Sequence, residues 1–290
     1  IGQFTQNTLG GVVSMGFPLG RGFTRMFTNY SYEKVRVTEI SDVYTDPLVL
    51  ARNPYLRDSL LIGQDGERII SKVTPSLIHN SVDNPITPTT GKRFSLSIDL
   101  AGIGGNTNYY KPMIESVVYW KQNSRFTLGY RAQFEYIHSF SGSKELPIFE
   151  KLFLGGEYSI RGFDIRTIGP QDSTTGLVLG GNKSILFNIE ELIAIAGPVR
   201  LVLFYDAGQV QPGPQVVGPS PFTPDGAFFG STLVPGRNFN LRDFKTSTGL
   251  EGRFFMPVLN VPFRLIFAFN PQRDGIRDNN FLPQKAFQFR

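Results

Sequence analysis

The amino-acid sequence predicts an all-β fold, and more specifically a transmembrane antiparallel β-barrel. Aromatic residues make up 13% of the 290 residues, and charged residues make up only 18%, below the roughly 25% that is usual for soluble domains. No stretch approaches the ~18 apolar residues that a membrane helix needs. Apolar and polar residues instead alternate, as in strands that face lipid on one side and a water-filled lumen on the other.

The segment 126–136 shows the alternation most clearly. Aromatic and apolar side chains share one face, and polar or small residues such as Arg131 and Glu135 share the other. The segments 93–100 and 263–270 alternate in the same way. A strand of about ten residues, tilted near 45°, crosses the hydrocarbon core of a bilayer. The pattern predicts eleven strands, at 7–17, 23–38, 68–81, 91–102, 108–121, 125–139, 184–195, 199–210, 244–257, 261–272 and 284–290.

The links between the predicted strands fall into two classes. Taken in chain order, short and long links lie at opposite ends of the strands, which is typical of tight periplasmic turns and extended external loops. Two links depart from this rule: 82–90 is proline-rich and longer than its side predicts, and 103–107 is shorter. The short links are 18–22, 122–124, 196–198 and 258–260, and the long ones are 39–67, 140–183, 211–243 and 273–283.

Two features of the predicted strands need an explanation. Pro75 and Pro112 fall inside predicted strands, where each requires a β-bulge or a different strand boundary. Eleven is an odd number, whereas bacterial single-chain barrels usually close with an even count. Because an open sheet edge cannot face lipid, either further strands lie before Ile1 or one of the predicted strands is wrong, and the abrupt start of the chain favours further strands.

Composition and motifs argue against several other classes of protein. The net charge is +5 with a pI near 9.4, but the basic residues are scattered, so no nucleic-acid partner is expected. The chain has no cysteine, and its two histidines, His79 and His138, lie far apart, so no metal site is expected. We find no phosphate-binding loop or nucleophile elbow, and we expect neither a cofactor nor enzyme activity. A soluble β-sandwich that serves as a binding module remains an alternative.

The candidate site lies in the glycine-punctuated segment 155–170. Arg161 and Phe163 flank Gly162, while Glu190 and Asp206 lie on the two strands that follow. If the apolar residues of those strands face lipid, both carboxylates point inward. A loop that folds into the lumen would then let the Arg161 guanidinium meet both of them. Gly162 would allow close approach to the wall, and Phe163 would contact apolar lumen side chains. The alternative is that these are ordinary lumen charges and that Arg161 is solvated.

These residues carry a resemblance to a known family. The run Ile160, Arg161, Gly162 and Phe163, preceded by Gly155 and Gly156, resembles the lumen-loop motif of the superfamily that includes BamA, TamA, the organellar import barrels and the two-partner secretion transporters. The stretches 146–154 and 167–170 are also similar to that family, and the resemblance spans essentially the whole chain. It implies that the loop arginine pairs with acids on the two following strands, which by motif position are Glu190 and Asp206.

The resemblance also implies an architecture and a function. Residues 1–290 would be the C-terminal part of a sixteen-stranded barrel, with the first strands and the periplasmic POTRA domains absent from this chain. The function would be to fold and insert β-barrel proteins into the outer membrane through a lateral seam, with Phe287 and Phe289 on the seam strand. The implied partners are unfolded outer-membrane client proteins, accessory lipoproteins, periplasmic chaperones and outer-membrane lipid. A polypeptide translocator of the same superfamily and a passive porin are the alternatives.

Overall fold

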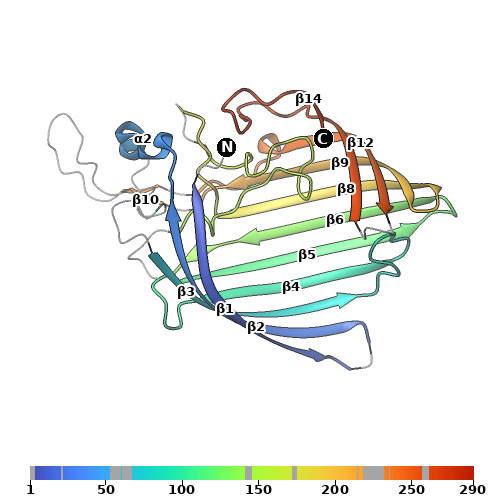
Figure 1. Cartoon of the computed structure of the whole chain (residues 1–290), viewed down its shortest axis with the longest axis horizontal. Helices are drawn as coiled ribbons and strands as arrows, with labels where there is room; N and C mark the ends of the chain where they lie inside the picture. The colour runs from blue at the N-terminus through green and yellow to red at the C-terminus, as the bar shows by residue number, and fades with distance from the viewer. Residues whose placement is uncertain are drawn as a thin grey trace.

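A computed structural model describes residues 4–20, 22–52, 60, 67–140, 146–171, 175–213, 215–217, 232–234, 236–256 and 261–290. Its main feature is one curved antiparallel sheet in which eleven strands follow one another in chain order (Figure 1). These strands are β1 (Thr5–Pro18), β2 (Thr24–Thr38), β3 (Glu67–Asn80), β4 (Gly91–Ala101), β5 (Tyr109–Lys121), β6 (Phe126–Tyr136), β8 (Lys183–Ala196), β9 (Val199–Gln211), β12 (Lys245–Met256), β13 (Val261–Phe269) and β14 (Phe287–Phe289).

All eleven predicted strands are present, with small changes at their ends. The predicted strand 125–139 is broken at Ile137, whose backbone N–H turns away to the Asn182 carbonyl at 2.7 Å. The two-residue strand β7 (His138–Ser139) then pairs with β5. The predicted strand 284–290 is reduced to the three residues of β14. The periodicity therefore located the strands but overestimated the last one.

The two faces of the sheet differ as the alternation predicts. On β13, Phe263, Leu265, Phe267 and Phe269 are exposed, whereas Ile266 and Ala268, which alternate with the last three, are buried. Aromatic and β-branched residues suit such a pleated surface. We call the concave face the inner face; the convex, aromatic-rich face suits contact with lipid.

The two prolines inside strands do not cause bulges, so that expectation is wrong. Pro75 pairs with Thr28 on β2 without a register shift. The ladder from β3 to β4 is interrupted beside Pro75 and resumes in the same register. Pro112 pairs with Ile98 in an unbroken β4–β5 ladder, and the β6–β7 break lies on its other side. A missing N–H removes a donor from one ladder, which need not move the register.

The loop-rich end of the sheet carries structure that the alternation did not predict. Two short helices, α1 (Asp42–Thr45) and α2 (Pro47–Arg52), follow β2. A small hairpin of β10 (Gln215–Val217) and β11 (Thr232–Val234) and the 3-10 helix η1 (Leu241–Asp243) lie between β9 and β12. None of the described helices is both long and apolar enough to cross a membrane. The predicted turn 258–260 lies outside the described residues.

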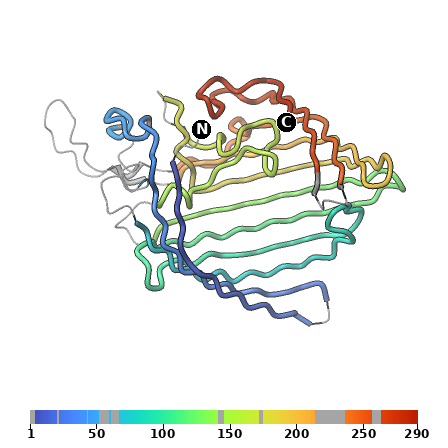
Figure 2. Tube along the Cα trace, viewed as in Figure 1, coloured from blue at the N-terminus to red at the C-terminus, as the bar shows by residue number. Residues whose placement is uncertain are grey.

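The sheet has two unpaired edges among the described residues. β1 pairs with β2 alone along fourteen residue pairs, and β14 pairs with β13 alone along three. In Figure 2 the two edge strands are the blue and red ends of the trace. The two edges therefore differ greatly in how firmly their strands are held.

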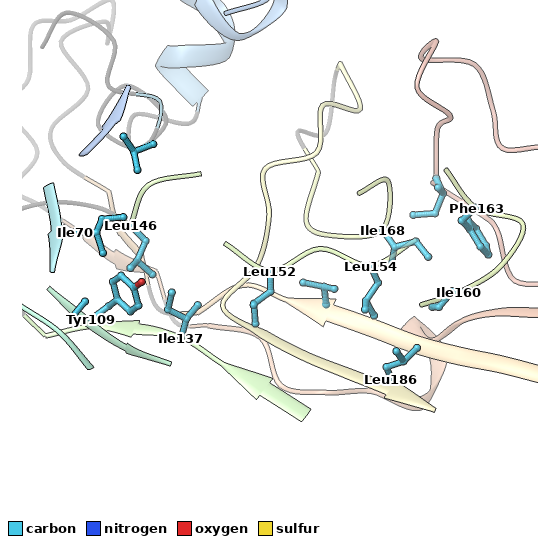
Figure 3. Packing of buried hydrophobic residues seen from close by; sticks show 14 residues of the cluster. Ile70, Tyr109, Ile137, Leu146, Leu152, Leu154, Ile160, Phe163, Ile168 and Leu186 are labelled. Carbon is cyan, nitrogen blue, oxygen red and sulfur yellow. The ribbon is translucent and has the colours of Figure 1, made fainter. Parts of the chain in front are cut away.

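The long link after β7 turns back onto the inner face instead of extending away. Its buried residues Leu152, Leu154 and Ile160 form one cluster with Leu186 of β8 (Figure 3). This cluster fills the concavity beside β8 and β9. It places residues 155–167, which we call the loop tip, against the inner face of the wall.

Candidate functional site at the loop tip

The loop tip is a tight structure that its own backbone closes. Leu154 and Ile168 exchange backbone hydrogen bonds at 2.9 and 3.0 Å, and this pair forms the base of the tip. Directly after it, Gly155 has φ +104, and a Cβ there would lie 2.3 Å from the Asp164 carbonyl oxygen. Only glycine fits such a close return with a positive φ. Gly156, also at positive φ, donates its N–H to the Phe163 carbonyl.

Two apolar side chains anchor the tip. Ile160 and Phe163 are fully buried, and they belong to the cluster that includes Leu154, Ile168 and Leu186. Figure 3 shows Ile160 on the side of the tip nearer the strands and Phe163 inside the curve of the loop. Burial of two such side chains stabilises the docked loop by roughly 1.5–3 kcal/mol each. The apolar contacts hold the backbone between them at a fixed height on the wall.

Arg161 lies between these anchors and is 2% exposed. Its Nε and Nη2 donate to the two carboxylate oxygens of Asp206 on β9 at 2.7 and 2.6 Å, and its Nη1 donates to Glu190 on β8 at 2.7 Å. Its backbone N–H also donates to Asp206, at 3.0 Å. The guanidinium carbon lies 3.8 Å from the centre of the Phe204 ring. The structure thus brings the loop arginine together with both acids that the sequence singled out.

The sequence analysis missed a third acid, Glu251 on β12. Its Oε2 accepts from Arg161 Nη1 at 2.7 Å, and the side chain is completely buried. Arg253 and Arg264 also bind it, at 2.7 and 2.5 Å. The alternation contained the signal, because Leu250 and Phe254 face outward and Glu251 must therefore face inward. We call Arg161 with Asp206, Glu190 and Glu251 the loop clamp.

Wall side chains also bind the backbone carbonyls of the tip. Arg131 of β6 reaches Tyr158 at 2.7 Å, and Asn188 of β8 reaches Ser159 at 2.8 Å. The Gly162 carbonyl accepts from both Asn270 and Gln284 at 2.9 Å. Gly162 itself is at φ +82, and a Cβ there would lie 2.6 Å from the Ala268 Cβ on β13. The tip is therefore fastened to strands from β6 to β13 and to the segment before β14.

The tip also reaches the last strand. Asp164 forms an ion pair with Arg290, and the Arg290 backbone is hydrogen-bonded to Ile266 of β13. On the outer face, the Phe287 and Phe289 rings of β14 lie 4.9 and 4.6 Å from Phe269 and Phe267. Both rings of β14 are largely exposed. The edge strand is thus held by a three-residue ladder, by backbone hydrogen bonds of Ala286 and Arg290 on either side of it, by two ring pairs and by contacts to the loop tip.

The described residues line an open chamber beside the clamp. It has a volume of about 840 Å³ and is lined by Arg161, Glu190 and Arg253, together with Arg93, Glu115 and Arg131 from β4, β5 and β6. Glu115 binds both Arg93 and Arg131, so this part of the lining keeps an excess of positive charge. The described residues contain no group of three or more His, Cys, Asp or Glu side chains that could hold a metal ion.

Comparison with known proteins adds to this geometry. The Omp85 superfamily domain matches residues 1–290. The outer membrane protein assembly factor BamA of Nitratidesulfovibrio vulgaris is 25% identical over 276 residues, which cover 94% of this chain and 30% of that protein. BamA of Neisseria meningitidis is 30% identical over 142 residues, which cover 46% of this chain and 18% of that protein. The chain thus spans less than a third of these curated relatives.

A solved structure shares the fold. The crystal structure of BamA from Haemophilus ducreyi lacking POTRA domains 1–3 aligns with 99% of this chain and 54% of that chain, at a TM-score of 0.73 and 20% sequence identity. The family resemblance and the all-β, outer-membrane barrel interpretation are therefore confirmed, and the soluble β-sandwich alternative is set aside.

Proposed function

Because this chain belongs to the Omp85 superfamily, we propose that it is part of the barrel of an outer-membrane protein assembly factor. Its task would be to lower the barrier for client strands that enter the bilayer, without covalent chemistry, so we propose no enzyme activity. Relatives that match it carry the name outer membrane protein assembly factor. The observation that carries the proposal is a buried clamp beside a weakly held edge strand.

The seam is the first part of the proposed mechanism. A strand edge in lipid exposes unpaired backbone groups, each of which costs several kcal/mol. β14 contacts β13 over a short stretch, three ladder pairs with backbone hydrogen bonds at Ala286 and Arg290 on either side, so it can separate from a neighbouring strand or accept a new one at lower cost than the long strands can. A client strand could then satisfy its hydrogen bonds by strand addition before it meets lipid. Phe287 and Phe289 would shield this edge from the bilayer.

The loop clamp is the second part. Arg161 joins carboxylates from β8, β9 and β12. These strands precede β13 and the edge strand β14 in the sheet. An opening seam would otherwise distort this wall. Three strands joined through one buried cation resist sliding past one another. Moving any of them would pull opposite charges apart in a place that water does not reach. We therefore propose that the clamp keeps the wall rigid while β14 moves.

We also propose that residues 1–290 form the C-terminal part of a larger barrel that contains earlier strands, preceded by POTRA domains. The free edge of β1 supports this proposal. β1 is exposed along nearly its whole length, including Leu9, Val13 and Met15, and pairs only with β2 among the described strands. A membrane sheet cannot leave such an edge to lipid. Further strands would pair with β1 and close the barrel.

The proposed partners follow from the function. Unfolded outer-membrane β-barrel proteins would be the clients, and outer-membrane lipid would surround the seam. Accessory lipoproteins and periplasmic chaperones are proposed from the family resemblance. A polypeptide translocator of the same superfamily is the second candidate, because a loop that leaves the lumen would open a path through it.

A liposome assay tests the proposal. The whole protein that carries this chain is reconstituted, an unfolded client barrel is added, and the fraction folded is followed by its heat-dependent gel mobility. Faster client folding than in empty liposomes, with no leakage of a small trapped dye, is the expected result. Leakage without faster folding would indicate a porin, and transport of a client into the liposome would indicate a translocator.

A further inference from the structure

Residues 81–90, between β3 and β4, form an ordered loop at the end of the sheet where the other described links are tight turns. The Asp83 carboxylate accepts from the Thr89 backbone at 2.9 Å, from the Thr89 hydroxyl at 2.5 Å and from the Thr90 backbone at 3.2 Å. The Asn84 side chain accepts from two further backbone N–H groups. This internal capping gives the segment a defined shape.

The loop reaches across the mouth of the sheet. Arg200, near the start of β9, donates from Nη1 to the Pro88 carbonyl and from Nη2 to the Thr87 carbonyl, each at 3.3 Å. β5, β6 and β8 separate β4 from β9 in the sheet, so the loop crosses beneath three strands. In Figure 1 the teal link between β3 and β4 lies at the same end as the tips of β12 and β13. Pro88 is buried in this position.

The charges around Arg200 favour this contact. Arg253 on β12 pairs with Arg200 in the ladder and repels it, while Asp83 in the loop attracts it. The Arg200 Nε is buried and finds no hydrogen-bond partner among the described residues. A partly desolvated cation needs hydrogen-bond acceptors or a nearby negative charge in place of the lost water, and the loop supplies both. Burial alone would raise the pKa of Asp83, but the hydrogen bonds from Thr89 and Thr90 lower it to about 2, so the attracting charge is present at neutral pH.

The loop and the loop tip enclose one space. The chamber of about 840 Å³ is lined on one side by Tyr158, Ser159 and Arg161 of the tip, and on the other by Asn84, Ile86 and Pro88. The tip enters from the end with long links and residues 81–90 enter from the end with short turns. A solute in the chamber would therefore meet a protein segment in both directions along the lumen.

We propose that residues 81–90 form a strap that closes the periplasmic mouth of the lumen, with Arg200 as its latch. The inference rests on the proposed placement of this chain in an outer-membrane barrel, with the short turns on the periplasmic side. It deepens the proposed function, because a lumen sealed on both sides leaves the seam in the wall as the route for clients.

Single-channel conductance of the whole protein in planar bilayers tests the strap. In one variant, residues 82–91 are replaced by Asn-Gly, so that Ser81 and Lys92, which are already hydrogen-bonded, flank a two-residue hairpin. A steady conductance several-fold above that of the unmodified protein is expected. In Arg200→Ala, brief openings should become several-fold more frequent. Arg242→Ala, which removes an exposed arginine at the other end of the sheet, should match the unmodified protein.

Unchanged conductance in the folded Asn-Gly variant would overturn the proposal. Should that variant not fold, cross-linking in the otherwise unmodified backbone decides. This chain contains no cysteine, so Thr87→Cys with Arg200→Cys should be joined by a short bis-maleimide, whereas Thr87→Cys with Lys245→Cys should not. Failure of the first pair to react overturns the strap. Client folding by the same variants is scored separately, so that loss of the strap and loss of the assembly activity remain distinguishable.

Discussion

Two arginines hold segments that turn into the lumen, and they do so by different chemistry. Arg161 in the loop tip binds carboxylates from three strands at 2.6–2.7 Å and is almost fully buried. Arg200 on the wall binds two backbone carbonyls at 3.3 Å and is only partly buried. Both arginines are ionised donors, but only Arg161 also has ionised acceptors, so attraction between opposite charges adds to its hydrogen bonds. The comparison indicates that the clamp is built to stay closed and the strap is built to release.

The same difference appears in what each arginine leaves behind. If Arg161 is lost, Asn188 is the one side-chain donor that Asp206 keeps among the described residues, so a fully buried carboxylate loses its charge partner. If Arg200 is lost, two carbonyls near water lose weak donors. Loss of Arg161 or its partners should therefore cost more stability than loss of Arg200.

Asp206→Ala should break the clamp at its centre. Arg161 would lose its bidentate partner while it remains buried, and removing one member of such a pair costs about 3–5 kcal/mol in the free energy of unfolding. Urea unfolding of the barrel in lipid would measure the loss. Glu67→Ala is the matched control, because its pairs with Lys34 and Arg36 are solvent-exposed and such pairs contribute little to stability. Equal losses in the two variants would show that the clamp contributes no more stability than an exposed ion pair.

Glu251→Gln should weaken the clamp less. The amide oxygen can still accept from Arg161, and Asp206 and Glu190 retain their contacts to that guanidinium, but Arg253 and Arg264 lose a charged acceptor. Hydrogen bonds to charged groups contribute about 1.5–3 kcal/mol each, and we expect a loss in that range by the same unfolding measurement. A loss as large as that of Asp206→Ala would contradict this ranking and would make Glu251 on β12 as important to the clamp as Asp206.

Gly162→Ala tests the close approach of the tip to β13. The new Cβ would lie 2.6 Å from the Ala268 Cβ, whereas Gly275→Ala, at a similar φ of +78, meets no atom within 4 Å. The strain of a positive φ is common to both, so their difference reports the overpacking, which costs about 1–3 kcal/mol. Protease sensitivity of the loop, compared between the two variants, checks it. Equal sensitivity would mean that the tip does not rest on β13.

Arg200→Ala should have the smallest effect on stability. Two hydrogen bonds from the charged guanidinium to neutral carbonyls are lost, but both are long, at 3.3 Å, and water can replace them. The loss should be about 1.5 kcal/mol, the low end for hydrogen bonds with a charged partner. The unfolding free energy should therefore change far less than in Asp206→Ala. A loss comparable to that of Asp206→Ala would contradict the distinction between a permanent clamp and a releasable strap.

The fold was largely predictable because lipid and lumen impose strict alternation. On β13, for example, the alternating residues Phe263, Leu265 and Phe267 predict the outward face, and all three are exposed. The short helices α1 and α2 were not predicted, because a four- or six-residue helix carries no periodic signal. Residues 82–90 were recognised as unusual from their length, but their contact with Arg200 depends on the curvature of the sheet, which no local pattern encodes.

The clamp was predictable in part. Glu190 and Asp206 follow from alternation on the two strands after the loop and from the family motif. Glu251 is separated from Arg161 by 90 residues and by the long link between β9 and β12. Its inward direction could be read from Leu250 and Phe254, but its height on the wall is set by the β9–β12 register, which the sequence does not reveal. The alternation within one strand predicts which face a side chain lies on, whereas its height on the wall depends on how the strands pair.

The rate of client folding by an Arg161→Glu variant tests the central claim most directly. The change places a fourth carboxylate among Asp206, Glu190 and Glu251, so the tip should leave the wall and residues 146–171 should become open to protease. The account predicts that the reconstituted variant folds a client barrel no faster than empty liposomes do. Client folding at the unmodified rate, with the loop still protected from protease, would contradict it.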